Sequence, residues 1–219
     1  MNVKPIGRII TDFPENFGLP RQSGLIEELT GKIVFDKEFD VPDAFRGLEE
    51  YSHIWLLWQL DECEWKPTVR PPRLGGNAKV GVFASRSPFR PNSIGMSVVR
   101  LDRVEYSEEG VILHVAGVDM RSGTPILDIK PYVAISDRIE SPMCGYSDRV
   151  KDNNLEVDAS EAILAALPAD KQQALIKLLA QNPAPHYQAD PDRIYGFAFA
   201  GREVKFRING NTAVLLSIE

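Results

Sequence analysis

The sequence predicts a mainly β protein in which a small N-terminal β-barrel domain is followed by a smaller α+β appendage. Residues 5–135 contain many short apolar runs separated by glycine and proline, which is typical of a closed or nearly closed barrel. Nothing in this region indicates a series of βαβ units. Beyond it, a helical apolar stripe precedes a second group of alternating apolar residues, which predicts two helices and a β-hairpin or meander.

The barrel strands are expected where apolar runs have the length of a strand. Residues 51–60 are strongly apolar and aromatic, and they predict a central strand that is buried on both faces. Val111, Leu113 and Val115 alternate with other residues and predict a strand with one buried face. Further strands are expected at 6–10, 32–35, 80–84 and 96–101, and a helical turn at 44–49.

The domain boundary is expected in a polar stretch, residues 138–159, which would link a domain at 1–137 to one at 160–219. Ser160 can cap a first helix, and Pro168 fits the first turn of a second helix that runs to about Gln181. Asn209-Gly210, between two alternating apolar runs, predicts a β-hairpin near the end of the chain.

The cysteines and histidines are too scattered to predict a metal site or a disulfide framework. The two cysteines lie far apart, and the three histidines lack ligand spacing. His53 lies in an apolar run and is expected to be a hydrogen-bonded core residue, whereas His114 is expected to be exposed. No metal ion is therefore expected. A small-molecule hydrolase that uses Cys63 or His53 remains a rival function.

The chain contains no apolar run that approaches the roughly 20 residues needed to span a bilayer. Its first residues also lack the apolar segment of a secretory signal peptide. Two thiols without a disulfide pattern suit a reducing compartment. We therefore expect a cytoplasmic protein that has no membrane partner.

Positive charge is concentrated in one window of an otherwise acidic chain. The net charge is −6 at pH 7, but residues 66–103 carry +7, so the rest carries −13. This window would attract an anionic ligand such as RNA, unless its arginines pair with acids elsewhere in the fold. Phe83 and Phe89 lie among these arginines, either as base-stacking residues or as core residues. The basic residues are Lys66, Arg70, Arg73, Lys79, Arg86, Arg90, Arg100 and Arg103.

Five motifs give the chain a resemblance to a known family. The adjacent glycines at 75 and 76 fit neither a dinucleotide fingerprint nor a P-loop. The motifs are instead Pro20-Arg21-Gln22, Arg46-Gly47-Leu48-Glu49, residues 70–76, residues 87–96 and residues 123–132. In these segments the sequence resembles the TsaA-like TrmO family of tRNA N6-methyltransferases that depend on S-adenosylmethionine. The resemblance covers residues 4–135 closely and the tail more loosely.

The resemblance implies a β-barrel methyltransferase outside the Rossmann-like class, working as a homodimer with the cofactor near the interface. It implies that the substrate is the adenosine just 3′ of the anticodon in threonine tRNA, already carrying an N6-threonylcarbamoyl group. The alternative is a barrel that binds S-adenosylmethionine or RNA without catalysis.

The resemblance also implies which residues contact the cofactor. The chain departs from the family at Ser122, where aspartate is common, at Ser93, where proline is common, and at Gln59, where histidine is common. The cofactor contacts would be Pro20, Arg21, Gln22, Gln59, Arg86, Met96, Ser122, Gly123, Thr124 and Pro125.

The reaction itself requires two further groups of residues. The attacking N6 must lose a proton, and Asp119 or Asp128 could accept it or could merely brace the loop. The tRNA phosphates and the threonyl carboxylate require cations. The candidates for these anions are Arg70, Arg73, Arg90 and Lys130.

Overall fold

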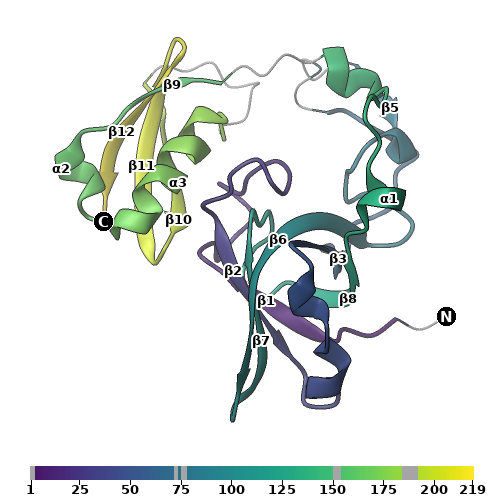
Figure 1. The fold of residues 1–219 in the computed structure, drawn as a ribbon. Helices are drawn as coiled ribbons and strands as arrows, with labels where there is room; N and C mark the ends of the chain where they lie inside the picture. The colour runs from purple at the N-terminus through teal and green to yellow at the C-terminus, as the bar shows by residue number, and fades with distance from the viewer. Residues whose placement is uncertain (1–2, 72–73, 75–77, 150–153, 184–191) are drawn as a thin grey trace.

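The computed structural model describes residues 3–71, 74, 78–149, 154–183 and 192–219. This part of the chain forms a closed six-stranded antiparallel barrel and a separate four-stranded sheet (Figure 1). The mainly β class with an N-terminal barrel is thereby confirmed. Around the barrel the strands follow the order β1 (Gly7–Thr11), β2 (Thr30–Phe35), β7 (Gly110–Ala116), β6 (Ile94–Ser107), β3 (His53–Gln59) and β8 (Pro125–Pro131).

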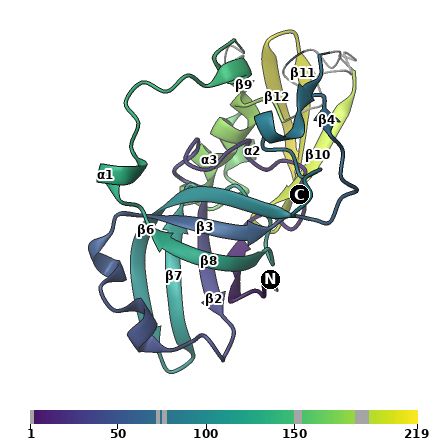
Figure 2. The same ribbon diagram turned by 90° about the vertical axis from the view of Figure 1, so that its right-hand side faces the viewer.

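The barrel interior is filled by the inward-facing residues of all six strands. On β7, Val111, Leu113 and Val115 are buried, which confirms the alternation expected from the sequence. β6 is much longer than expected, because its first half pairs with β3 and its second half pairs with β7. A register shift between Leu101 and Arg103 bends the strand between these two partners. Figure 2 shows β3 between β6 and β8.

The expectation that residues 51–60 form a strand buried on both faces is wrong. β3 alternates, with Ile54 and Leu56 fully buried and Trp55 and Trp58 only partly buried. In a small barrel only one face of a strand points to the interior, so the other face is covered only where loops cross it. Trp55 is covered in this way, and its Nε1 donates to Asp137 Oδ2 at 2.9 Å.

Two further expectations need correction, one after β3 and one before it. Residues 80–84 do not form one strand: β5 (Val80–Gly81) pairs only with β4 (Thr68–Val69) and is followed by the 3-10 turn η4 (Val82–Ala84). The expected turn at 44–49 is two 3-10 turns, η1 (Pro42–Phe45) and η2 (Leu48–Glu50).

The C-terminal sheet has the order β10 (Ile194–Phe199), β11 (Arg202–Asn209), β12 (Thr212–Ile218) and β9 (Glu156–Asp158). β9 lies within the expected linker, yet it pairs in parallel with β12 and is part of this sheet. The Ser160 side chain accepts from Ile163 N and so caps α2 (Glu161–Leu164), as expected. The long helix α3 (Ala169–Ala180) follows Pro168, and the Asn209-Gly210 hairpin is confirmed.

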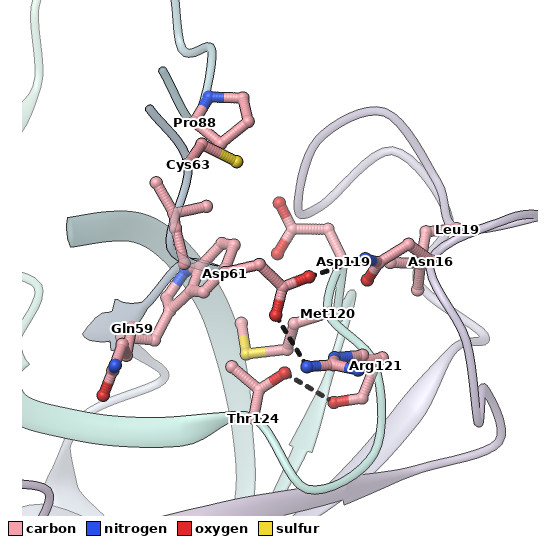
Figure 3. Close-up of a pocket in the computed structure, with 12 residues that line it drawn as sticks. Asn16, Leu19, Gln59, Asp61, Cys63, Pro88, Asp119, Met120, Arg121 and Thr124 are labelled. Atoms are coloured by element: carbon pink, nitrogen blue, oxygen red, sulfur yellow. Dashed lines mark hydrogen bonds and ion pairs between the residues drawn. The ribbon is translucent and has the colours of Figure 1, made fainter. Parts of the chain in front are cut away.

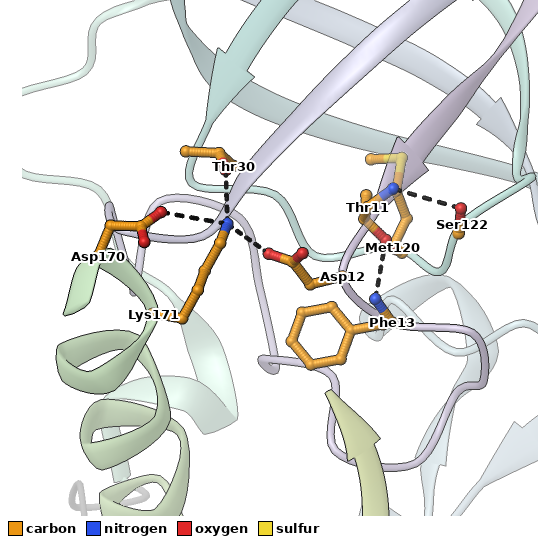
Figure 4. Close-up of polar contacts among 8 residues, drawn as sticks. All are labelled: Thr11, Asp12, Phe13, Thr30, Met120, Ser122, Asp170 and Lys171. Atoms are coloured by element: carbon orange, nitrogen blue, oxygen red, sulfur yellow. Dashed lines mark hydrogen bonds and ion pairs between the residues drawn. The ribbon is translucent and has the colours of Figure 1, made fainter. Parts of the chain in front are cut away.

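The barrel and the C-terminal sheet share one hydrophobic core. Phe13, just after β1, packs on Phe199 of β10 with ring centroids 5.2 Å apart. Beside it, Lys171 Nζ of α3 lies 2.6 Å from Asp12 Oδ2 and 3.2 Å from Thr30 Oγ1 (Figure 4). The Lys171 side chain is only 15% exposed, so this ion pair is shielded from solvent more than those at the surface.

The connection between the two sheets runs over the surface. It begins with α1 (Ala134–Asp137), leaves the barrel in both views, and reaches a short 3-10 turn, η5 (Gly145–Arg149) (Figures 1 and 2). Within the described residues, no helix has the length and apolar character required to cross a membrane.

Candidate functional site

A hollow of about 350 Å³ opens at one end of the barrel (Figure 3). Its walls come from the end of β3, the loop after β1, the loop between β7 and β8, and the segment that precedes β6. The volume lies within the range of small-molecule sites. The lining residues are Asn16, Leu19, Trp58, Gln59, Leu60, Asp61, Cys63, Pro88, Asp119, Met120, Arg121 and Thr124.

A chain of hydrogen bonds leads from the indole of Trp58 to the carboxylate of Asp119. Trp58 Nε1 donates to Ser97 Oγ at 3.1 Å, and Ser97 Oγ donates to Asp119 Oδ1 at 2.7 Å. Ser97 is fully buried, so neither bond competes with bulk water. Gly95, beside Trp58 on β6, leaves the space that the indole ring occupies, because a Cβ at Gly95 would overlap the ring.

Burial raises the pKa of the Asp119 carboxyl above its usual value. The hydrogen bond from Ser97, the Ser23 backbone N–H and the positive charge of Arg86 act in the opposite direction, because they stabilise the carboxylate. Asp119 is thus an ionisable group held in a fixed orientation at a largely desolvated site. Such a group, placed in a hollow, is typical of an acid or base in catalysis.

A second carboxylate, Asp61, also lines the hollow. Its Oδ1 lies 2.6 Å from Arg121 Nη2, and its Oδ2 accepts from Asn16 Nδ2 at 2.8 Å (Figure 3). Thr124 Oγ1 donates to the Arg121 carbonyl at 2.8 Å. These contacts join three segments that are far apart in the sequence.

The loop between β7 and β8 is held against β1 by its backbone. Ser122 N donates to Phe13 O and Gly123 N donates to Ile9 O, both at 2.7 Å. Gly123 has a φ of +84°, a conformation that a residue with a side chain rarely adopts. Ser122 Oγ accepts from Thr11 N at 3.4 Å (Figure 4), so the Ser122 side chain helps to attach the loop to β1.

Only some of the expected cofactor residues meet in the hollow. Gln59 and Thr124 line it together with Asp119. Arg86 donates to Gln22 Oε1, and its charge acts on Asp119, so this pair lies beside the hollow. The expected contacts that do not line the hollow are Pro20, Arg21, Met96, Ser122, Gly123 and Pro125.

Arg21 has partners in the C-terminal domain. Its guanidinium donates to the carbonyls of Gln181 and Asn182, at the end of α3, with a distance of 3.2 Å to the second. No sequence pattern predicts this contact, because the partners are backbone atoms about 160 residues away. The motif that was expected to bind the cofactor therefore also attaches α3 to the barrel.

The two carboxylates proposed as proton acceptors lie in different surroundings. Asp119 faces the hollow, whereas Asp128, on β8, lies 2.9 Å from Lys130 Nζ and is not among the lining residues. Sequence analysis missed the contributions of Asn16 and Asp61. Neither belongs to a motif, and they acquire a role only through their contacts with each other and with Arg121.

The basic window is partly dispersed by the fold. Arg100 pairs with Asp102 and Glu27, and Arg103 pairs with Glu105. The other described cations of the basic window lie on the segment between β3 and β6. Arg73 lies outside the described residues. The described cations of that segment are Lys66, Arg70, Lys79, Arg86 and Arg90.

The histidines do not lie as expected. His114 is not exposed: its side chain is 15% exposed, and Nε2 lies 2.8 Å from Glu105 Oε2. His53 is half-buried, with Nδ1 3.0 Å from Ser52 Oγ. Cys63 lines the hollow without a histidine among the described lining residues, which gives no support to a thiol–imidazole hydrolase. Among the residues that the structure describes, no three His, Cys, Asp or Glu side chains gather as a metal site.

Both parts of the chain match family models. The tRNA-methyltransferase O N-terminal domain matches residues 8–138, and the TrmO C-terminal domain matches residues 152–219. The chain is 40% identical over 192 residues to the tRNA (adenine(37)-N6)-methyltransferase of Escherichia coli strain K12, with 84% of this chain and 82% of that protein covered.

Similarity to Pseudomonas aeruginosa is found both in sequence and in structure. A putative S-adenosylmethionine-dependent methyltransferase is 40% identical over 206 residues, which cover 89% of this chain and 87% of that protein. A crystal structure of TrmO has a TM-score of 0.81 and 32% identity, covering 100% of this chain and 96% of that one.

Gly95→Ala is expected to lower the free energy of unfolding by about 1–3 kcal/mol, because the added methyl group overlaps the Trp58 ring in a packed site. Urea unfolding followed by tryptophan fluorescence would measure this. Gly81→Ala is the matched control, since nothing lies within 4 Å of a Cβ at Gly81 and its φ is −60°. Equal stability of the two variants would contradict the close contact between Gly95 and Trp58.

Proposed function

Since the chain belongs to the TrmO family and is a tRNA (adenine(37)-N6)-methyltransferase, we propose that its substrate is N6-threonylcarbamoyladenosine in threonine tRNA. The methyl group would be transferred to N6 of this nucleoside, just 3′ of the anticodon. The observation that carries the proposed methyl transfer is the partly buried, oriented Asp119 carboxylate in a hollow of small-molecule size.

The residues around the hollow fit S-adenosylmethionine. Apolar walls from Leu19, Leu60 and Met120 suit the adenosine and the hydrocarbon chain of the cofactor, and the Asp119 carboxylate suits its positively charged sulfur. When bound, S-adenosylmethionine supplies an activated methyl group on a positively charged sulfur. The residues that we propose to hold it are Gln22, Gln59, Arg86 and Thr124.

Asp119 is the proposed acceptor of the N6 proton. Its carboxylate is fixed by Ser97, so it does not have to reorganise when the proton arrives. Trp58 and Pro88 line the same space with apolar surface. Alignment of the reacting atoms, rather than strong base chemistry, would supply most of the rate. The proton then passes from Asp119 to solvent.

Asp128 and Lys130 are not assigned to the proton transfer in this proposal. Because they pair with each other on β8, Asp128 is not poised to accept a proton in the hollow. Arg70 is exposed and remains a candidate for tRNA phosphates, as does Lys130. Cytoplasmic localisation stays a prediction.

Asp119→Asn is expected to lower kcat by about 10²- to 10⁴-fold, the usual contribution of a general base. The neutral amide also avoids the cost of a buried charge, so the variant should unfold at a higher temperature at neutral pH. Ser97→Ala should move the acidic limb of the pH–rate profile to higher pH, because the carboxylate loses a hydrogen bond.

Single-turnover methyl transfer across pH 5–9 would measure these effects, with Asp128→Asn as the matched control that should retain the wild-type profile. Binding of S-adenosylhomocysteine by calorimetry shows whether each variant keeps its site. Wild-type kcat in Asp119→Asn would remove Asp119 as the proton acceptor.

The proposed substrate is tested by incubating the enzyme with S-adenosylmethionine and threonine tRNA that either carries or lacks the threonylcarbamoyl group. We expect nucleoside mass spectrometry to show one added methyl group on the modified adenosine only. Methylation of the unmodified tRNA at an equal rate would retain the enzyme class but refute the threonylcarbamoyl requirement. Binding without any gain in mass would favour the non-catalytic barrel.

A homodimer is proposed because α1 and the segment that follows it carry apolar side chains that the described chain leaves uncovered. Ile135, Ile139 and Met143 are 96%, 72% and 97% exposed, and this segment leaves the barrel in Figure 1. A second copy of the chain is the proposed partner. Light scattering should report a dimer for the wild type and a monomer for Ile139→Asp, whereas Ile10→Asp on β1 is the control. A wild-type monomer would refute the proposal.

A further inference from the structure

Phe83 differs from the other phenylalanines of this protein in its exposure to solvent. All ten lie in the part of the chain that the structure describes, and nine of them are buried or half-buried. The Phe83 side chain is 73% exposed. A single exposed apolar residue needs no explanation by itself, so the question is what surrounds the ring and what holds it there.

The backbone that carries Phe83 is firmly held. Val82, its neighbour in η4, is buried, and Val82 N donates to Pro67 O at 3.0 Å. Ser85 N and Ser85 Oγ both donate to Val82 O, at 3.1 and 2.9 Å. The ring is therefore displayed on an ordered turn with little conformational entropy left to lose on binding.

A guanidinium group lies beside the Phe83 ring. Arg90 Cζ is 5.7 Å from the ring centroid, within the range of a cation–π contact. Arg90 is anchored by its own loop, because Nη1 donates to Ser85 O at 2.6 Å and to Val82 O at 3.2 Å. Through these bonds Arg90 orients the turn and flanks the ring, and its expected role as a phosphate contact stays a prediction.

The segment between β3 and β6, which carries Phe83, also carries exposed cations. Arg70 follows β4 and Lys79 precedes β5, both are exposed, and neither forms an ion pair with another described residue. Nearby, Lys66 Nζ lies 4.6 Å from the centroid of the Phe89 ring. A protein partner would favour a contiguous apolar patch, whereas a flat ring among cations suits an unpaired base with its phosphates.

We propose that Phe83, flanked by Arg90, is a platform on which an unpaired base of the tRNA anticodon loop stacks. This inference rests on the proposed function and deepens it. The loop that displays Phe83 also supplies Pro88 to the wall of the hollow, so the stacked base belongs to the segment next to the target adenosine. Stacking on the ring holds that segment while the target base enters the hollow.

The test compares Phe83→Ala and Phe83→Tyr in binding a fluorescent anticodon stem-loop RNA over a series of salt concentrations. Phe83→Ala should weaken binding by about tenfold or more, because base stacking on an aromatic side chain is lost, and Phe83→Tyr should restore it. The slope of affinity against salt should not change. Arg70→Ala should instead reduce that slope, by about one released counterion.

A set of stem-loops with single abasic positions identifies the stacked base. One abasic RNA should bind wild type and Phe83→Ala equally, since the interaction is already absent. Tyr106→Ala, at the far end of β6 and 49% exposed in the wild type, is the control for loss of an exposed aromatic residue. Thermal unfolding and S-adenosylhomocysteine binding should match wild type in every variant.

The outcomes separate this inference from the proposed function. If the wild type methylates the modified tRNA and Phe83→Ala binds the stem-loop equally well, only the stacking role of Phe83 is refuted. Loss of S-adenosylhomocysteine affinity, or of the dimer, in Phe83→Ala would assign the ring to the cofactor or to the subunit interface instead. Failure of the wild type to bind any tRNA would refute the function itself.

Discussion

Closure of the barrel at its seam between β1 and β8 is the constraint on which the site depends. The seam is short, with Gly7 opposite Ile126 and Arg8 opposite Pro125. Ile9 extends it, donating to Thr124 O at 3.1 Å and accepting from Gly123 N. Closure pairs the backbone N–H and C=O groups that would otherwise be unpaired at the edges of the sheet. It also fixes the loop that carries Asp119, because that loop enters β8 at this seam.

A carboxylate in a largely buried hollow opposes folding unless its surroundings stabilise it. Asp119 shows both effects, since burial raises its pKa while Ser97 and the Ser23 amide favour the charged form. The balance leaves a group that can change protonation state without moving. Proteins retain such costly arrangements at sites of function, where the cost to stability is offset by the packing of the core. Here that core continues from the barrel into the C-terminal sheet.

The contact between the two sheets gives the C-terminal domain a physical connection to the site. Arg21 reaches the end of α3 while the next residue, Gln22, accepts from Arg86 beside the hollow. Elsewhere in the interface, Lys171 forms an ion pair with Asp12 (Figure 4). The next residue, Phe13, accepts a backbone hydrogen bond from Ser122 in the loop between β7 and β8. Displacement of the C-terminal domain would therefore also move the segments that form the hollow.

The amino-acid sequence alone predicts the strand alternation, the Ser160 cap, the Asn209-Gly210 hairpin and the motifs of the family. These are local patterns, whose period or turn chemistry is complete within a few residues. Which charged side chains remain available to a ligand depends on the tertiary structure. Arg100 belongs to the basic window of the sequence, yet it pairs with Glu27, 73 residues away along the chain. Such partners, like Ser97 for Asp119 or Asp61 for Arg121, are selected by distances in space, which strand closure sets and no local pattern encodes.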